Sequence, residues 1–262
     1  MGKFFETVPE NLAKWVLEQK LFWVATAPLS STGHVNVSPK GGADFGLLDD
    51  KTFWYMDFTG SGNETISHLY EPDNGRITVM FNAFDGPPRI VRFFGHGRVL
   101  ERRGHVAGDG RAFDEFVKKH DVPVIDSSRS IIIVDIHQVN SSCGYNVPYY
   151  EFKSFRTALH STFSARAEKY RNGVEKEARE RYWAWKNAYS LDGLPGMQVG
   201  FEVGKKEHIA PIEKMVGPMA PRRYHRDRRF TVWHLVFVAA LSAVLTAFWP
   251  LLFALLREHV PA

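Results

Sequence analysis

Residues 21–41 read LFWVATAPLSSTGHVNVSPKG, and this stretch carries the pattern on which the fold depends. Apolar and β-branched residues predominate in Leu21–Ala27 and recur in His34–Ser38, as they do in short β-strands. The Ser-Thr-Gly sequence at 31–33 between the two runs is typical of a turn. The stretch therefore predicts a β-hairpin, and the chain continues in the same manner beyond it.

Four more runs of similar composition predict further strands: Thr52–Phe58, Arg76–Phe84, Arg89–Leu100 and Ser130–His137. Short helices are predicted over residues 9–20, Asn63–Tyr70 and Arg111–His120. Six strands joined mostly by hairpins, with short helices between them, predict a mainly β (α+β) domain. Its expected form is a small antiparallel barrel, because closing a sheet removes its exposed edges.

The pattern changes to a helical one after Pro148, and it runs from about Ser154 to Ala188 with many Arg, Glu and aromatic residues. The chain is therefore expected to have four parts. They are a barrel over 1–150, a helical extension over 151–200, a basic linker over 201–229 and a membrane anchor over 230–256.

The anchor is predicted because residues 230–256 contain no Asp, Glu, Lys or Arg. A helix that spans a membrane needs about 20 consecutive apolar residues. Residues 221–229, just before the run, contain five arginines, and such positive flanks stay in the cytosol. The pattern predicts a single-pass C-terminal anchor with the N-terminal body in the cytosol, and favours the endoplasmic reticulum over the mitochondrial outer membrane. The alternative is a buried core helix.

The charge balance argues against nucleic-acid binding. The chain has 33 Lys and Arg against 29 Asp and Glu. Without residues 221–229, Arg257 and Glu258, the remaining 27 charges of each sign leave residues 1–220 formally neutral. A nucleic-acid-binding body would carry a basic patch or stripe. The single cysteine, Cys143, excludes an intrachain disulfide and is expected to be buried and structural.

No nucleophile or metal motif stands out among the remaining residues. The eleven histidines form no His-Glu-x-x-His pattern and show no paired spacing with a cysteine. The catalytic residues are therefore unknown at this point, and no metal is expected.

The clearest chemical feature is the loop TGSGNET over residues 59–65. Its two glycines let the backbone approach a ligand closely, and hydroxyl and amide side chains follow them. The loop opens a predicted helix, whose free N–H groups favour a phosphate. The alternative is a simple helix cap, in which Ser61 or Asn63 bonds to the first turn.

Two further stretches have the composition of an anion site. The sequence NVSPKGG over residues 36–42 places a hydroxyl, a cation and two glycines at a strand end, although an ordinary strand exit has the same appearance. In the strand over residues 89–98, alternation puts Arg92, His96 and Arg98 on one face. Arginine pairs well with anions, and the alternative is a solvated outer face.

Nine stretches occur in the order found in a known family: Phe22–Ala27, His34–Gly41, Thr59–Thr65, Arg76–Phe81, Phe84–Arg92, Gly95–Val99, Ser142–Tyr145, Val147–Pro148 and Leu191–Gly196. With them, roughly residues 5–196 resemble the pyridoxamine 5'-phosphate oxidase-like, FMN-binding split-barrel family, and in particular its flavin-nucleotide-binding branch. The resemblance implies a six-stranded antiparallel split β-barrel. It also implies a homodimer with FMN in a groove between subunits, and an FMN-dependent oxidoreductase that acts on an unknown small substrate.

Carried over by this resemblance, the cofactor-binding residues are Val37, Ser38 and Lys40 for the flavin, Thr59, Ser61, Asn63 and Thr65 for its phosphate, and Arg92 on the later strand. His96 and Tyr145 are candidate proton donors by residue type alone. The alternative function is a non-catalytic flavin- or haem-binding module or a membrane-tethered scaffold.

Two departures from the family pattern are visible. Asn63 and Glu64 stand where the oxidases place a strongly basic pair, and a carboxylate repels a phosphate unless it points away or caps the helix. The chain past Pro148 also lacks the Trp- and Arg-containing segment that holds the vitamer phosphate in the oxidases. Vitamin B6 oxidation is therefore not expected.

Overall fold

The computed structural model describes residues 2–103, 110–217, 220 and 239–249. The chain forms two compact units, Met1–Ala220 and Pro221–Ala262, and each is considered by itself. The first unit contains the whole sheet and all the named helices.

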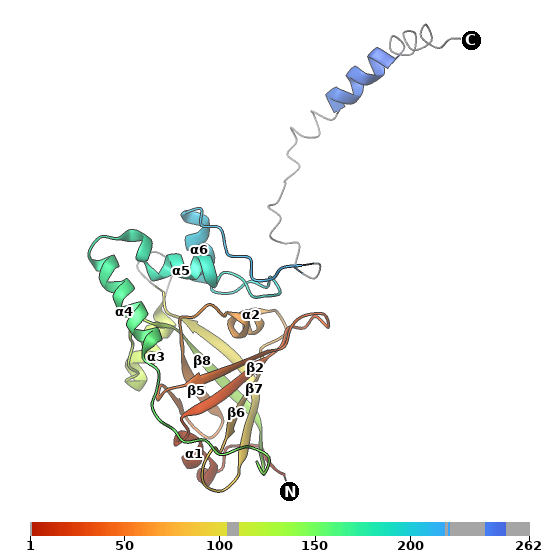
Figure 1. Ribbon diagram of the computed structural model, residues 1–262. Coiled ribbons are helices and arrows are strands. Elements are labelled where there is room, and N and C mark those ends of the chain that lie inside the picture. The colour runs from red at the N-terminus through yellow and green to blue at the C-terminus, as the bar shows by residue number, and fades with distance from the viewer. Residues whose placement is uncertain (1, 104–109, 218–219, 221–238, 250–262) are drawn as a thin grey trace. The chain divides into compact units, whose positions relative to one another are not determined.

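The first unit is built on one antiparallel sheet that curls around a core (Figure 1). Its strands are β1 Lys3–Phe5, β2 Leu21–Thr26, β3 Asn36–Gly41, β4 Phe45–Leu47, β5 Thr52–Phe58, β6 Arg76–Asn82, β7 Ile90–Glu101 and β8 Ser128–Ser142. The order is β3-β2-β6-β7-β8-β5-β4, and β1 pairs with β8. The path begins with β3 and ends with β4, so the described sheet is open between these two strands, as in a split barrel.

All six predicted strands are present, and the hairpin over residues 21–41 is the antiparallel pair of β2 and β3. The sheet has eight strands rather than six, which corrects the predicted count. The two additional strands, β1 and β4, have three residues each. Such short strands show too little alternation to be distinguished from a loop by sequence.

The core follows from alternation along the strands. Phe22 and Val24 on β2 are buried, while their neighbours Leu21 and Trp23 are only partly so. Inside the barrel, aromatic rings from four strands meet, and the Phe22–Phe53 and Phe81–Phe93 ring centroids are each 5.6 Å apart. Edge-to-face packing of this kind stabilises the fold beyond the contribution of apolar burial alone. A second core lies outside the barrel, between helix α3 and the paired strands β5 and β8.

Helices α1 Glu10–Leu17, α2 Glu64–Tyr70 and α3 Arg111–His120 confirm the three short predicted helices. The long helix predicted from about Ser154 to Ala188 is instead divided into α4 Ala158–Arg171, the 3₁₀ turn Glu175–Glu177 and α5 Arg179–Lys186. Gly173 interrupts it with a φ of 86°, a conformation that a glycine adopts without strain. A further helix, α6 Gln198–Lys206, was not predicted.

The predicted membrane anchor is corrected by the structure. Within 230–256, the described residues form a helix over 239–249, and no helix among the described residues is long and apolar enough to cross a membrane. Residues 230–238 and 250–256 lie outside the described part of the chain. The transmembrane helix, and the membrane localisation derived from it, are therefore not supported.

Candidate functional site

The loop predicted to bind phosphate follows β5 directly, and three of its polar side chains already form hydrogen bonds within the chain. Thr59, Asn63 and Thr65 are buried, and Ser61 is exposed. The Thr59 hydroxyl accepts a 3.0 Å hydrogen bond from the indole N–H of Trp183. The Asn63 amide donates to Ser67 at 3.1 Å, and the Thr65 hydroxyl accepts from Asn36 at 3.0 Å.

Residues 183–214, here called the covering segment, lie against this loop and the start of α2 (Figure 1). The Asn187 side-chain amide donates to the Gly60 carbonyl at 2.9 Å. Gly196 packs so closely that a Cβ added there would lie 1.7 Å from Asn63 Nδ2. The covering segment therefore closes the loop. Position 196 must be glycine, because a larger residue there would clash with Asn63.

Glu64 provides the negative charge at the start of α2. Its carboxylate accepts the Asn63 backbone N–H at 2.8 Å and the Leu191 N–H at 3.2 Å, and it pairs with Lys214 at 3.5 Å. Burial raises the pKa of Glu64, but Lys214 and the backbone N–H groups outweigh it, so the pKa is lowered overall. Asn63 occupies the N-cap position without a side-chain capping bond.

These contacts decide whether a phosphate fits the loop. A bound phosphate needs several free donors and positive potential. Here the Thr59 and Thr65 hydroxyls already accept hydrogen bonds from the chain, the Asn63 amide donates to Ser67, and an ionised carboxylate occupies the helix start. In this conformation, residues 59–65 do not fit a flavin phosphate.

Lys40 belongs to a buried ion cluster at the same end of the barrel. Its ammonium lies 2.8 Å from Asp57 Oδ1, and Arg129 Nε lies 2.7 Å from Asp57 Oδ2. Arg129 also donates to the Gly62 carbonyl at 2.8 Å, which ties the cluster to the loop. Burial raises the pKa of Asp57, but Arg129 and Lys40 prevail and lower it to about 2.

Sequence reasoning did not identify Asp57 or Arg129. The available signal was a single charge in each of two strongly apolar stretches, TFWYMDF and SRSIIIV. Charges are rarely buried unless they are paired. The sequence could therefore have marked both charges as members of buried ion pairs, but not as partners of each other.

Strand register separates the remaining predicted residues into two groups. Ser38 and Lys40 alternate with Val37 on β3, so they point to the opposite face of the sheet. Ser38 donates to Asn36 at 3.0 Å. Residues directly opposite each other on neighbouring strands point to the same face of the sheet. Arg92 on β7 lies opposite Met80, Met80 lies opposite Trp23, and Trp23 lies opposite Pro39. Pro39 and Val37 are two residues apart on β3 and share a face, so Arg92 lies on the face of Val37. The structure therefore does not bring Arg92 together with Lys40 or the loop.

The face that carries Val37 and Arg92 is here called the outer face. Val37 is 59% exposed, and Trp23, Met80 and Arg92 are each partly exposed. Among the described residues, the Arg92 guanidinium reaches only neutral acceptors, Asn140 Oδ1 and Ser142 Oγ, each at 3.5 Å. The outer face thus combines apolar surface with a cation that no described carboxylate neutralises.

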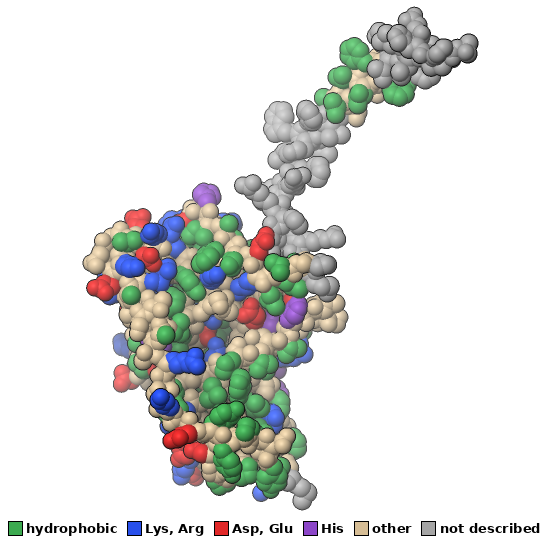
Figure 2. Space-filling view, viewed as in Figure 1, with side chains coloured by type: hydrophobic (Ala, Val, Ile, Leu, Met, Phe, Trp, Pro, Cys, Tyr) green, Lys and Arg blue, Asp and Glu red, His purple; other side chains and the backbone are tan. Residues whose placement is uncertain are grey.

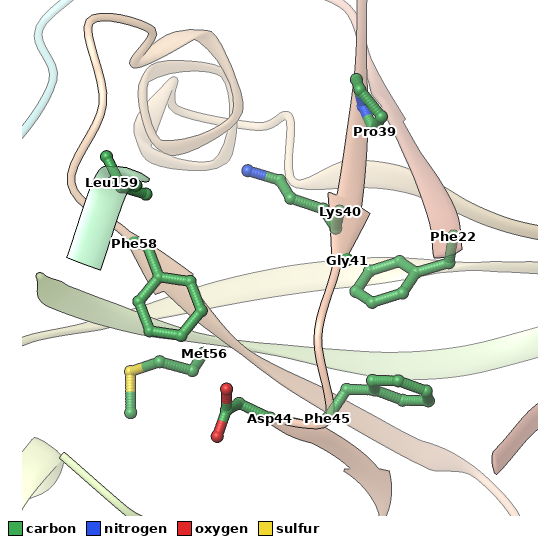
Figure 3. Close-up of a pocket in the computed structure, with 9 residues that line it drawn as sticks. All are labelled: Phe22, Pro39, Lys40, Gly41, Asp44, Phe45, Met56, Phe58 and Leu159. Carbon is green, nitrogen blue, oxygen red and sulfur yellow. The ribbon is translucent and has the colours of Figure 1, made fainter. Parts of the chain in front are cut away.

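A cavity of about 200 Å³ opens beside Lys40 (Figure 3). It is lined by Phe22, Pro39, Lys40, Gly41, Asp44, Phe45, Met56, Phe58 and Leu159. A second cavity of about 150 Å³ lies beside Tyr145, whose side chain is 84% exposed. Cys143 is exposed, which corrects the expectation that it is buried. His96 is exposed and packs its ring 5.5 Å from that of His137.

The surface of the first unit carries charges of both signs. In Figure 2, basic and acidic side chains are interspersed with apolar ones on the face in view. This agrees with the formal neutrality of residues 1–220.

Comparison with known proteins establishes the family. Residues 8–143 match the family model described as pyridoxamine 5'-phosphate oxidase. The chain is also 40% identical over 205 residues to the pyridoxamine 5'-phosphate oxidase family protein ustO of Aspergillus flavus, covering 75% of this chain and 78% of that protein. The protein therefore belongs to the pyridoxamine 5'-phosphate oxidase family.

Solved structures are similar at a much lower level. HupZ from Group A Streptococcus is 20% identical with a TM-score of 0.36, covering 50% of this chain and 92% of that one. The FAD binding protein from Mycobacterium smegmatis is 13% identical with a TM-score of 0.34, covering 53% of this chain and 97% of that one.

Proposed function

We propose that the protein is a flavin-dependent oxidoreductase that binds FMN on the outer face, as a homodimer, and acts on a small-molecule substrate. Family membership supports a flavin. The observation that carries the proposal is the outer face itself, where Arg92 lies without a described carboxylate partner among apolar side chains. A flat ring suits apolar surface, and a guanidinium suits an anionic group.

The role of each residue follows from its place on that face. Val37, Trp23 and Met80 would pack against the ring and exclude water from it. Arg92 would hold an anionic part of the cofactor. A bound flavin supplies hydride or electron transfer, and the protein orients it and sets its electrostatic surroundings. Because residues 59–65 do not fit a phosphate, the cofactor phosphate is assigned no position in that loop.

Cavity size supports a dimeric site. Ligand pockets usually measure about 300–1,000 Å³. The two cavities described above measure about 200 and 150 Å³. A flavin bound by this chain would therefore lie on an open face, and a second copy would supply the other wall.

An absorbance spectrum of the purified full chain tests the proposal, followed by release and identification of the cofactor by mass spectrometry. We expect a flavin spectrum that yields FMN, and a dimer by light scattering. Arg92→Ala should weaken FMN binding about tenfold, the typical loss for one charge-assisted contact. The control is Lys14→Ala, since Lys14 is exposed on α1 and pairs with Glu10. A colourless protein that neither FMN nor FAD reconstitutes would refute the flavin, and release of FAD would refute FMN alone.

A further inference from the structure

The cavity beside Lys40 lies where the sheet is open, between β3 on one side and β4 and β5 on the other. Figure 3 shows the rings of Phe22 and Phe45 on one side and the ring of Phe58 on the other. The carboxylate of Asp44 lies at the base, and the Lys40 ammonium points away from it. The charged and aromatic lining of the cavity thus consists of three rings, Asp44 and Lys40.

Two charged side chains line this space, Lys40 and Asp44, and only Asp44 lacks a described partner of opposite charge. Among the described residues, no side chain forms a hydrogen bond or ion pair with the Asp44 carboxylate. Burial raises the pKa of Asp44, although the nearby His160 acts in the opposite direction. The His160 Nδ1 atom forms a 2.8 Å hydrogen bond with the Ser127 hydroxyl. The Lys40 ammonium forms an ion pair with Asp57 at 2.8 Å.

An organic cation satisfies both features of the cavity. Aromatic faces attract cations through their quadrupole, and rings that surround a quaternary ammonium are a known mode of recognition. An anion would be repelled by Asp44, and a neutral apolar molecule would leave the half-buried carboxylate without a partner. At about 200 Å³, the cavity is smaller than the usual ligand pocket of about 300–1,000 Å³.

We propose that this cavity binds a small organic ammonium ion, with Asp44 as its counter-ion and Phe22, Phe45 and Phe58 as its walls. The groups assigned to the cation, Asp44 and the three rings, are not among the side chains assigned to the flavin, so the two sites can be tested separately. The occupant must be small, such as a methylated or primary amine, because a nucleotide exceeds the volume available.

Calorimetric titration of the full chain with choline tests the site, with 3,3-dimethylbutan-1-ol as the uncharged molecule of the same shape. We expect choline to bind at least tenfold more tightly than the alcohol. Asp44→Asn should weaken choline at least tenfold, and Asp44→Glu should restore part of the affinity. Phe58→Leu should weaken choline while leaving the carboxylate in place.

Asp85→Asn is the matched control, because Asp85 is exposed and lies outside this cavity. Each variant must retain the melting temperature of the parent protein. Asp44→Asn should meet this condition, since the backbone carbonyl that accepts the Met56 N–H is unchanged. Equal affinity for choline and the alcohol, no choline binding up to about 10 mM, or choline binding by Asp44→Asn at the parent level would each overturn the proposal.

Discussion

The indole N–H of Trp183 donates a 3.0 Å hydrogen bond to the buried hydroxyl of Thr59, 124 residues earlier in the chain. This bond joins the helical extension to the loop for which the sequence predicts phosphate binding. Trp183 is itself fully buried, so the contact is part of the core. It explains why the loop is closed by the protein's own chain.

Gly196→Ala should detach the covering segment from the loop. The added Cβ would lie 1.7 Å from Asn63 Nδ2 and 2.6 Å from the Asn187 carbonyl, so the backbone must move. Overpacking of this kind costs about 1–3 kcal/mol. Limited proteolysis should cut the variant faster within the extension. Gly60→Ala is the control, because nothing lies within 4 Å of its added Cβ. Equal cleavage rates for the two variants would contradict the assignment.

Asp57→Asn should strongly destabilise the first unit. The substitution leaves Lys40 and Arg129 without their shared carboxylate, and Arg129 has only 5% of its side chain exposed. Removing one partner of a buried ion pair costs about 3–5 kcal/mol. The melting temperature should fall by roughly 10 °C, and Glu115→Gln, on the exposed side of α3, should leave it unchanged. A fall of less than about 2 °C would show that the cluster adds little to stability.

The same cluster predicts a loss of stability in acid. The pKa of Asp57 is lowered from 3.8 to about 2 in the folded state. A carboxylate with a depressed folded pKa contributes stability above its unfolded pKa and loses it as the pH falls through the folded value. The shift corresponds to about 2 kcal/mol, which should disappear between about pH 4 and pH 2. Urea unfolding at several pH values measures it, and in Asp57→Asn this part of the slope should be absent.

Glu101→Gln should loosen the start of α6. The buried Glu101 carboxylate accepts the backbone N–H groups of Gln198 at 2.8 Å and Val199 at 3.1 Å, and also the Tyr70 hydroxyl at 2.8 Å. Loss of such charge-assisted bonds costs about 1.5–3 kcal/mol. Amide hydrogen exchange should become faster over α6. Glu202→Gln serves as the control, since Glu202 is half-exposed and pairs with Arg103. If exchange is unchanged, Glu101 does not hold the helix.

Particular residues show how far the sequence could lead at the site. The family resemblance assigns Val37, Ser38 and Lys40 to the flavin together, yet alternation sends Val37 to the other face. The loop at 59–65 has the composition of a phosphate site, but composition does not show which groups the rest of the chain will engage. The apolar run at 230–256 resembled a spanning helix, whereas the described helix there covers only 239–249.

By itself, the sequence determined the six main strands, the hairpin at 21–41, the three short helices and the family. The strands, the hairpin and the helices depend on alternation, spacing and turn residues among neighbours in the chain, and the family on stretches that resemble its members. Only the tertiary structure decided the pairing of Asp57 with Arg129, the contact of Trp183 with Thr59, and the closure of the loop by the covering segment. Such contacts join residues far apart in sequence. Many polar groups are possible partners for each other until packing brings one pair within bonding distance.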